Sequence, residues 1–320
     1  MKVSVLGCGR WGSFLAWYNH RLGNEVVSFG PEHDYSYQIL KNTGRNEYVR
    51  FSEDIRLTCD LDEALDHADT VIISISSQGL RGFAGEIVKR NVKDKKFVLC
   101  MKGIEETTGK RLSEVAIESG IPKEHIAVWS GPGHIQEFTK NVPNCMVIDS
   151  YDPALTKFLA DAFKSDLIRF YYGNDIIGTE VGAATKNIMG IVAGVLDGLN
   201  YASLKGPLMA RGAREVARLI KAMGGNELSA YGLCHLGDYE TTLFSEHSHN
   251  RRWGEAYVLG QPFDKLAEGV ATARAVAKAA AKLGVDMPIT NAVNEMIQHK
   301  TPPKDLLVTL FERDTKKEFV

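Results

Sequence analysis

The chain has 320 residues, of which 44% are hydrophobic and 24% charged, and 38 basic against 40 acidic residues leave a formal net charge of −2. This length exceeds what one hydrophobic core usually fills, so two domains are expected. The balanced charge argues against nucleic acid or an anionic membrane surface as the main partner.

The five cysteines are scattered and none forms a CxxC pair. They predict reduced thiols, with neither a disulfide framework nor a metal site. The longest purely apolar runs fall short of the ~20 residues that a membrane span needs. The chain opens on MKVSVLG, which is strand-like and has no cleavable leader before it. A cytoplasmic protein without integral membrane contact is therefore expected.

Short apolar segments alternate with helical ones in the first half of the chain. The strand candidates are brief, rich in β-branched residues and almost continuously apolar, as parallel strands covered on both faces are. The expected strands are 2–7, 25–30, 70–76, 96–103 and 126–131. The expected helices between them are 11–22, 62–67, 79–90 and 110–119. This alternation predicts an α/β fold, a Rossmann-type doubly wound parallel sheet.

The strand pattern stops after about residue 173, and long helical stretches follow. The expected helices are 176–197, 207–223, 265–283 and 288–299. The sequence therefore predicts an α/β domain over residues 1–173 and an all-α C-terminal domain over residues 174–320.

A G-x-G-x-x-G pattern follows the first strand directly, in VLGCGRWGSFLA, and opens a helix. Gly7 permits a tight turn, Gly9 lets the backbone approach a pyrophosphate, and Gly12 lets helix and strand pack closely. Amide groups at the helix N-terminus then face the phosphates. The strand–turn–helix context favours dinucleotide binding over a glycine-rich turn without a ligand. Arg10 and Trp11 lie within the same loop and are expected to bind the cofactor.

The end of the second strand bears on the choice between NAD and NADP. Gly30, Pro31 and Glu32 follow it, and the first basic side chain beyond His33 is Lys41. An acidic residue here accepts a hydrogen bond from the ribose 2′-hydroxyl of NAD, whereas an arginine receives the 2′-phosphate of NADP. NAD is favoured.

The segment GTEVGAATKNIMGIVAGVLDGL, residues 178–199, contains one lysine, Lys186, and no other charged residue between Glu180 and Asp197. Positions 182, 190, 194 and 198 are glycines, spaced so that they share one helical face with Lys186. Each glycine costs a helix about 1 kcal/mol relative to alanine. The row therefore predicts close approach of another backbone or a ligand, and we expect it to clear a passage for nicotinamide and substrate. A solvated surface lysine is the alternative.

Three more stretches, MKGIEETTGKRLSE, SGPGHIQE and LGDYETTLFSEHSHNRRWG, complete an ordered series with the two above. From about residue 2 to 312 the series resembles the soluble NAD(P)-dependent glycerol-3-phosphate dehydrogenases. The resemblance implies NAD or NADP as cofactor, a substrate-binding helical domain at 174–320 and a homodimer. It also implies the interconversion of dihydroxyacetone phosphate, a small phosphorylated three-carbon substrate, and sn-glycerol 3-phosphate, for glycerophospholipid synthesis.

The resemblance also implies roles for individual residues. Lys186 matches the lysine assigned as proton donor or acceptor, Lys102 matches a second lysine touching substrate and nicotinamide, and Asp238 matches their acidic partner. The other positions matched to substrate binding are Gly131, Gly133, Asn187, Thr242, Ser248, His249 and Asn250. Those matched to cofactor binding, beside the glycine turn and Lys102, are Ile135, His249 and Glu268.

The chemistry of ketone reduction agrees with these roles. Hydride addition builds negative charge on the carbonyl oxygen, so a cation placed there stabilises the transition state and can donate a proton. Burial and the neighbouring Lys102 are expected to lower the pKa of Lys186, while Asp238 opposes them.

The sequence departs from the family pattern at the phosphate site. The family usually has Ser-Arg-Asn-Arg, and this chain has SHNRR, with His249 at the arginine position. Arginine is a permanent bidentate donor for phosphate, whereas histidine is mostly neutral above pH ~6.5. Arg251 and Arg252 are candidates to compensate, or else solvated residues at a helix start. Gly133 stands where the family favours serine or threonine.

Three hypotheses remain open from the sequence. The first is glycerol-3-phosphate dehydrogenase activity. The second is a related hydroxyacid or ketone dehydrogenase with a different substrate, motivated by the missing arginine. The third is a non-catalytic dinucleotide-binding paralogue, which would not need both lysines, Asp238 and Asn250 together.

Overall fold

An eight-stranded sheet dominates the first half of the chain in the computed structural model, which describes residues 1–90 and 92–318. The strand order is β3-β2-β1-β4-β5-β6-β7-β8, and neighbouring strands are parallel except for β6 and β7. The strands are β1 (Lys2–Leu6), β2 (Glu25–Phe29), β3 (Arg56–Thr58), β4 (Thr70–Ile73), β5 (Lys96–Leu99), β6 (Ile126–Ser130), β7 (Asn144–Ser150) and β8 (Ile168–Tyr172).

The five expected strands are present as β1, β2, β4, β5 and β6, and the Rossmann-type fold is confirmed. The sheet is parallel as expected except at one pair, because β7 runs antiparallel to β6. Strands β3, β7 and β8 were not predicted. β3 has only three residues, β7 is interrupted by polar side chains, and β8 is a partly exposed edge strand. These strands therefore lack the continuous apolar signal of the central ones.

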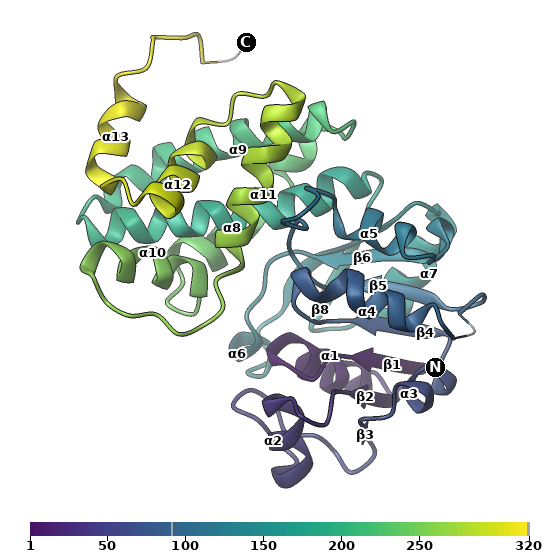
Figure 1. Cartoon of the computed structure of the whole chain (residues 1–320). Coiled ribbons are helices and arrows are strands. Elements are labelled where there is room, and N and C mark those ends of the chain that lie inside the picture. Colours follow the sequence, from purple (N-terminus) through teal and green to yellow (C-terminus); the bar gives the residue numbers. More distant parts are fainter. Residues whose placement is uncertain (91, 319–320) are drawn as a thin grey trace.

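Helices cover both faces of the sheet (Figure 1). The helices of this half of the chain are α1 (Arg10–Arg21), α2 (Tyr35–Thr43), α3 (Leu61–His67), α4 (Leu80–Ile87), α5 (Leu112–Glu118), α6 (Ile135–Phe138) and α7 (Pro153–Phe163). Because successive strand residues face opposite ways, Trp129 and its neighbour Val128 enter different cores. Trp129 stacks on Phe163 of α7 in a core that also contains Phe14 of α1, and Val128 lies in the core that contains residues of α4 and α5.

The second half is helical, as predicted. It contains α8 (Ile176–Gly198), α9 (Lys205–Ala222), α10 (His249–Leu259), α11 (Glu268–Leu283), α12 (Pro288–His299) and α13 (Pro303–Phe311), with the short helices η5 (Leu236–Asp238) and η6 (Glu240–Phe244). Helix α8 is buried over almost its whole length, as expected for a central helix that is apolar all round. Figure 1 shows α8 leading from the sheet into the helical half.

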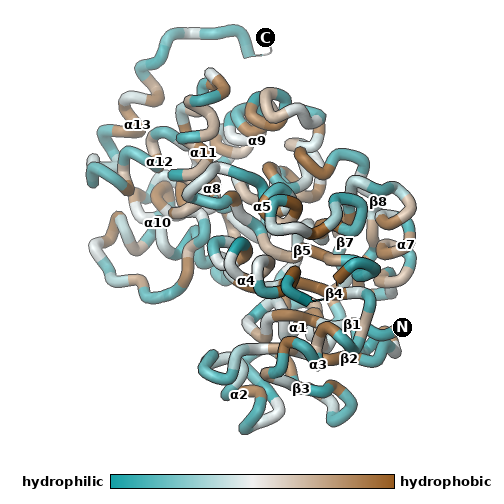
Figure 2. The backbone as a smooth tube through the Cα atoms, turned by 45° about the vertical axis from the view of Figure 1, so that its right-hand side comes forward, coloured by the Kyte–Doolittle hydropathy of each residue, from teal (hydrophilic) through white to brown (hydrophobic). Residues whose placement is uncertain are grey.

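Hydropathy follows this architecture. Figure 2 shows hydrophobic backbone stretches concentrated in the central strands, whereas the segment after α13 is mainly hydrophilic. Within the described ranges, no helix combines the length and the apolar character required to cross a membrane.

The first turns of α8 are bonded to the sheet half. Asp149 of β7 accepts hydrogen bonds from the Thr179 hydroxyl at 2.9 Å and from the Asp175 amide at 3.0 Å. One turn on, Glu180 forms a buried ion pair with Arg111 at 2.6 Å and accepts a hydrogen bond from the Ser113 amide at 2.8 Å. These contacts fix the start of α8 against the sheet.

The glycine row of α8 packs against helix α10. A Cβ on Gly194 would lie 1.8 Å from the Arg251 carbonyl oxygen, and one on Gly254 would lie 2.1 Å from the Ile191 carbonyl oxygen. A Cβ on Gly198 would come within 2.8 Å of Val258. We call this α8–α10 contact the glycine seam. The expectation of close backbone approach was right, but the expectation of a passage for nicotinamide and substrate was wrong, because α10 fills the space at Gly194 and Gly198, and His235 and Thr242 fill it at Gly182 and Gly190.

Candidate active site

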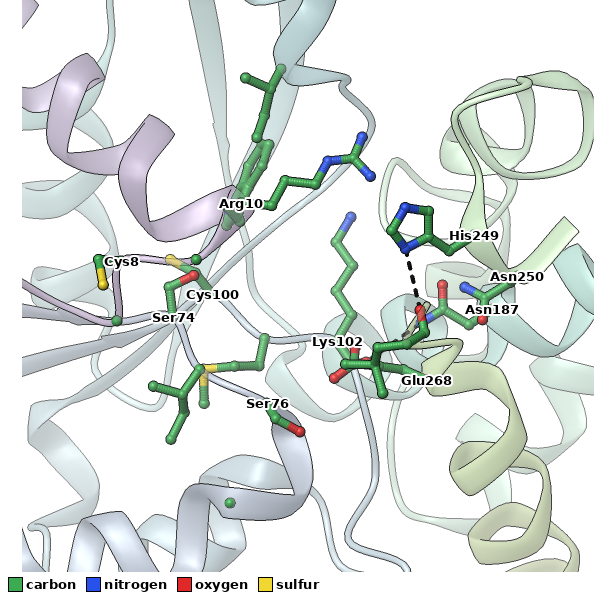
Figure 3. A pocket seen from close by; sticks show the side chains of 18 of the residues that line it. Cys8, Arg10, Ser74, Ser76, Cys100, Lys102, Asn187, His249, Asn250 and Glu268 are labelled. Carbon is green, nitrogen blue, oxygen red and sulfur yellow. Dashed lines mark hydrogen bonds between the residues drawn. The ribbon is translucent and has the colours of Figure 1, made fainter. Parts of the chain in front are cut away.

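A cleft of about 740 Å³ opens at the carboxyl ends of β1, β4, β5 and β6, where ligands of doubly wound sheets bind. Its opposite wall comes from α8, η6 and the N-terminal ends of α10 and α11. Figure 3 shows side chains from both walls converging on this space. The volume lies in the range of pockets that bind small molecules and cofactors.

The turn between β1 and α1 has the geometry expected for a dinucleotide. Gly7 has a φ of +111°, and a Cβ there would lie 2.1 Å from the Ser74 carbonyl oxygen. A Cβ on Gly12 would lie 1.9 Å from the Gly7 carbonyl oxygen. A Cβ on Gly9 would meet no atom within 4 Å. The first and third glycines thus pack the turn, and the second leaves open space beside the amides of α1, as a pyrophosphate requires.

The acidic residue that faces the cleft beyond β2 is Asp34, which sequence reasoning missed. Glu32, the residue favoured from the sequence, does not line the cleft and pairs with Lys41 at 3.3 Å. Asp34 and Pro31 line it, and the Asp34 carboxylate also caps α2 by accepting from the Ser36 amide at 2.7 Å. A two-residue shift of this kind depends on how the loop turns after the strand, which the sequence pattern does not determine.

Two lysines from different halves of the chain share one carboxylate oxygen. Lys186 Nζ lies 2.7 Å from Asp238 Oδ2 and donates to Thr242 Oγ1 at 2.8 Å. Lys102 Nζ lies 2.8 Å from the same Oδ2 and donates to the Gly131 carbonyl at 2.9 Å. The loop after β5 supplies Lys102, α8 supplies Lys186, and η5 supplies Asp238.

The charges of this cluster oppose one another. Burial lowers the pKa of Lys186 to about 8, with Asp238 acting to raise it and Lys102 acting to lower it further. Although burial raises the pKa of Asp238, the two ammonium groups hold it below its ordinary value. The lowered pKa that the sequence predicted for Lys186 is confirmed. Lys186 is therefore a cation that can lose its proton near neutral pH.

The polar residues around the lysines connect the surrounding segments. Asn187 Nδ2 donates to the Lys102 carbonyl at 3.5 Å, and Asn250 Oδ1 accepts from the Gly269 amide at 2.9 Å. Ser248 caps α10. Glu268, at the start of α11, accepts from the Ser77 amide at 3.2 Å. These bonds hold the cleft-facing ends of α10 and α11 in place.

Most residues singled out from the sequence line the cleft: Gly7, Gly9, Arg10, Trp11, Lys102, Gly133, Ile135, Lys186, Asn187, Thr242, Ser248, His249, Asn250 and Glu268. Three lie immediately behind its wall. Gly12 packs under the turn, Gly131 holds Lys102 through its carbonyl, and Asp238 is buried beneath both lysines.

His134, His247 and Thr241 also line the cleft and were not predicted. Each lies within one or two residues of a predicted position, in GPGHI, SEHSH and YETTL, but a histidine or threonine in a loop carries no signal of its own. Gly133 has a φ of +152°, and a Cβ there would lie 2.4 Å from the Phe138 ring. This packing explains glycine where the family favours serine or threonine.

The two arginines that follow Asn250 do not compensate for His249. Arg251 points away and its Nε lies 2.6 Å from Asp197 Oδ2. Arg252 is exposed and stacks on Phe263, with 5.9 Å from the guanidinium carbon to the ring centroid. Neither lines the cleft.

Known proteins match the chain over nearly its full length. Residues 2–156 match the model of the NAD-dependent glycerol-3-phosphate dehydrogenase N-terminus, and residues 175–308 match the model of its C-terminus. The glycerol-3-phosphate dehydrogenase [NAD(P)+] of Chlorobium limicola is 34% identical to this chain, and the alignment covers 99% of each protein. That of Fusobacterium nucleatum is 33% identical, and the alignment covers 99% of this chain and 98% of the relative. The crystal structure of the Coxiella burnetii glycerol-3-phosphate dehydrogenase superposes with a TM-score of 0.89 at 27% identity, covering 98% of this chain and 99% of that one. With this fold and this cleft, the chain belongs to the NAD-dependent glycerol-3-phosphate dehydrogenase family.

Proposed function

We propose that this protein reduces dihydroxyacetone phosphate to sn-glycerol 3-phosphate with NADH or NADPH. The observation that carries the proposal is the cluster of Lys186, Lys102 and Asp238 at the inner end of a cleft that begins at a dinucleotide-binding turn. The cofactor supplies the hydride when it is bound. Everything else that the reaction needs is a proton and a positively charged environment for the carbonyl oxygen.

Lys186 is proposed as the proton donor. As the carbonyl carbon accepts hydride, the carbonyl oxygen takes the proton from Lys186 Nζ, and the lysine is left neutral. A pKa of about 8 makes both protonation states accessible near neutral pH. Lys102, held by the Gly131 carbonyl and Asp238, keeps a second positive charge beside the developing alkoxide. Asp238 orients both lysines. Asn187 and Thr242 hold Lys102 and Lys186 through the bonds described above.

The turn at Gly7, Gly9 and Gly12 is proposed to hold the cofactor, with Trp11, Ile135 and Glu268 lining the same cleft. We propose that NAD is preferred over NADP. The carboxylate of Asp34 lines the cleft beyond β2, where it can accept a hydrogen bond from a ribose hydroxyl and repels a 2′-phosphate.

We propose residues 1–173 as the cofactor-binding domain and residues 174–320 as the substrate-binding domain, because β8 ends at Tyr172 and α8 begins at Ile176. Supply of glycerol phosphate for phospholipid synthesis and assembly as a homodimer are proposed on the family resemblance. The five free cysteines suit the reducing cytoplasm, which we propose as its location. Light scattering of the purified protein tests the dimer.

The test of the activity is steady-state reduction of dihydroxyacetone phosphate, with NADH and NADPH in parallel and unphosphorylated dihydroxyacetone as the comparison substrate. We expect turnover with a strong preference for the phosphorylated ketone and for NADH. Equal activity on the unphosphorylated ketone contradicts the proposed substrate and favours a related ketone dehydrogenase. Binding of NADH without any reduction of phosphorylated ketones indicates a non-catalytic paralogue.

A further inference from the structure

The phosphate end of the cleft lacks the arginine that the family pattern places at position 249. His249 lies with Nδ1 3.3 Å from the Leu266 carbonyl oxygen (Figure 3). A carbonyl only accepts, so Nδ1 carries the hydrogen, and a neutral ring then presents a lone pair at Nε2. Burial and the charge of Arg10 lower the pKa of His249, which favours this neutral form. Neutral His249 therefore offers an anion no donor at Nε2.

Arg10 faces His249 from the opposite wall. Figure 3 shows its side chain extending from the first turn of α1 across the cleft, with the guanidinium directed at the His249 ring. Its contacts are weak: Nη2 donates to Gln136 Oε1 at 3.4 Å, and the guanidinium carbon lies 5.3 Å from the centroid of the Tyr48 ring.

Arg10 also differs from the other cleft cations in its charge balance. Lys102 and Lys186 are both paired with Asp238. Over residues 1–90 and 92–318, no carboxylate lies within ion-pair distance of Arg10. A cleft-facing guanidinium with its charge uncompensated is a binding group for an anion, because its planar set of donors matches phosphate.

His134 supplies a second polar group at the same place. Its ring is nine-tenths buried, its Nε2 has no hydrogen-bond partner among the described residues, and it lies 5.5 Å from the His247 ring, centroid to centroid. Buried polar atoms normally have partners, so the unpartnered Nε2 of a ring that lines the cleft is a candidate contact for a bound ligand.

We propose that Arg10 binds the phosphate group of the substrate, supplying from the cofactor-binding turn the guanidinium that position 249 lacks, with His134, in the neutral tautomer that carries its hydrogen on Nε2, as a further donor. This inference rests on the proposed function. The cofactor pyrophosphate has its own site in the open space at Gly9 and the amides of α1, whereas the Arg10 guanidinium extends away from that turn toward α10.

The experiment measures binding of glycerol 3-phosphate and of glycerol to NADH-saturated protein by calorimetry, together with the NADH affinity. Arg10→Ser is expected to weaken glycerol 3-phosphate binding by about 10- to 100-fold, the usual cost of losing a hydrogen bond to a charged group. Glycerol binding is expected to stay unchanged, and NADH affinity is expected to fall by less than glycerol 3-phosphate binding does, because Arg10 also belongs to the turn that holds the cofactor. Arg252→Ser, which removes an exposed arginine outside the cleft, is the matched control and is expected to leave all three unchanged.

A second variant tests directly whether the guanidinium at position 10 replaces the one missing at position 249. His249→Arg in the Arg10→Ser background is expected to restore glycerol 3-phosphate binding, because it returns a guanidinium to the opposite wall. Thermal melts report whether each variant folds. If Arg10→Ser does not fold, Arg10→Lys replaces it, because lysine keeps the positive charge but lacks the bidentate guanidinium. Its expected result is a smaller loss of glycerol 3-phosphate binding.

Three results would overturn the inference. The first is an Arg10 variant that binds NADH more weakly but binds glycerol 3-phosphate as the wild type does. The second is an Arg252→Ser variant that loses as much glycerol 3-phosphate affinity as the Arg10 variant. The third is a wild-type protein that does not bind glycerol 3-phosphate. Because these readouts need no turnover, they separate the two proposals. A protein that binds glycerol 3-phosphate through Arg10 but does not reduce dihydroxyacetone phosphate contradicts the proposed function alone.

Discussion

Asp238→Asn tests how the protonation of Lys186 is set. The substitution keeps the size of the side chain and removes the charge that two ammonium groups share. At the 2.7 Å that separates Lys186 Nζ from Asp238 Oδ2, opposite unit charges attract by roughly 6 kcal/mol at an effective dielectric constant of about 20. One pKa unit corresponds to about 1.4 kcal/mol, so this attraction accounts for up to about four units. Lys102 remains and still repels Lys186.

The pKa of Lys186, about 8 in the wild type, is therefore expected to fall below neutrality in Asp238→Asn. Reduction needs the protonated lysine, so kcat/KM declines as pH rises through this pKa. The declining limb is expected near pH 8 in the wild type and below pH 7 in the variant, with at least about a tenfold loss at pH 7 if the pKa falls by two units.

The assay is the pH profile of kcat/KM for ketone reduction from pH 5.5 to 9.5, at saturating NADH. Asp197→Asn is the matched control, because Asp197 is also a mostly buried carboxylate held by two cations, Lys205 at 2.8 Å and Arg251 at 2.6 Å, but lies outside the cleft. It is expected to lower stability without moving the limb. A limb that stays near pH 8 in Asp238→Asn, or moves upward, refutes the reasoning.

Three further substitutions are informative. Lys186→Ala is expected to abolish turnover and spare NADH binding by fluorescence titration; substantial residual turnover refutes its role as proton donor. Gly194→Ala forces a Cβ against the Arg251 carbonyl and is expected to lower the free energy of unfolding in urea by about 1–3 kcal/mol. The control is Gly206→Ala, whose Cβ meets nothing within 4 Å and which is not expected to lower it. Equal losses in the two variants contradict close packing at the glycine seam. Asp34→Asn keeps the cap and removes the charge, so the ratio of NADPH to NADH activity should rise, and an unchanged ratio excludes Asp34 as the discriminating residue.

The sequence predicted those parts of the fold whose signal is local. The central strands are continuously apolar, the long helices have apolar faces, and the turn at Gly7 combines a glycine pattern with its flanking elements. The strands β7 and β8 were missed because they lie toward the edge of the sheet, where burial is partial and polar residues are tolerated.

The candidate site divides in the same way. Lys186 was identifiable because a lone charge in an apolar helix is conspicuous. Two other features of the site, the packing of the glycine row and the identity of the acid that faces the cleft, depend on contacts between distant segments. The local sequence pattern does not contain that information. The glycine row around Lys186 was expected to clear a passage for a ligand, although His235, Thr242 and α10 cover it, and the acid facing the cleft is Asp34 instead of Glu32. Likewise, only the structure places Arg10 opposite His249.

The bonding of α8 to the sheet has a consequence for building chimeras of this protein. Residue 173 is a natural crossover point by composition, yet Glu180 lies six residues before Lys186 and its ion-pair partner Arg111 belongs to the other half. Removing one partner of a buried pair costs about 3–5 kcal/mol. A recombinant that takes its C-terminal half from a relative must therefore also take matching residues at 111 and 113. Otherwise the helix that carries Lys186 begins with an uncompensated charge.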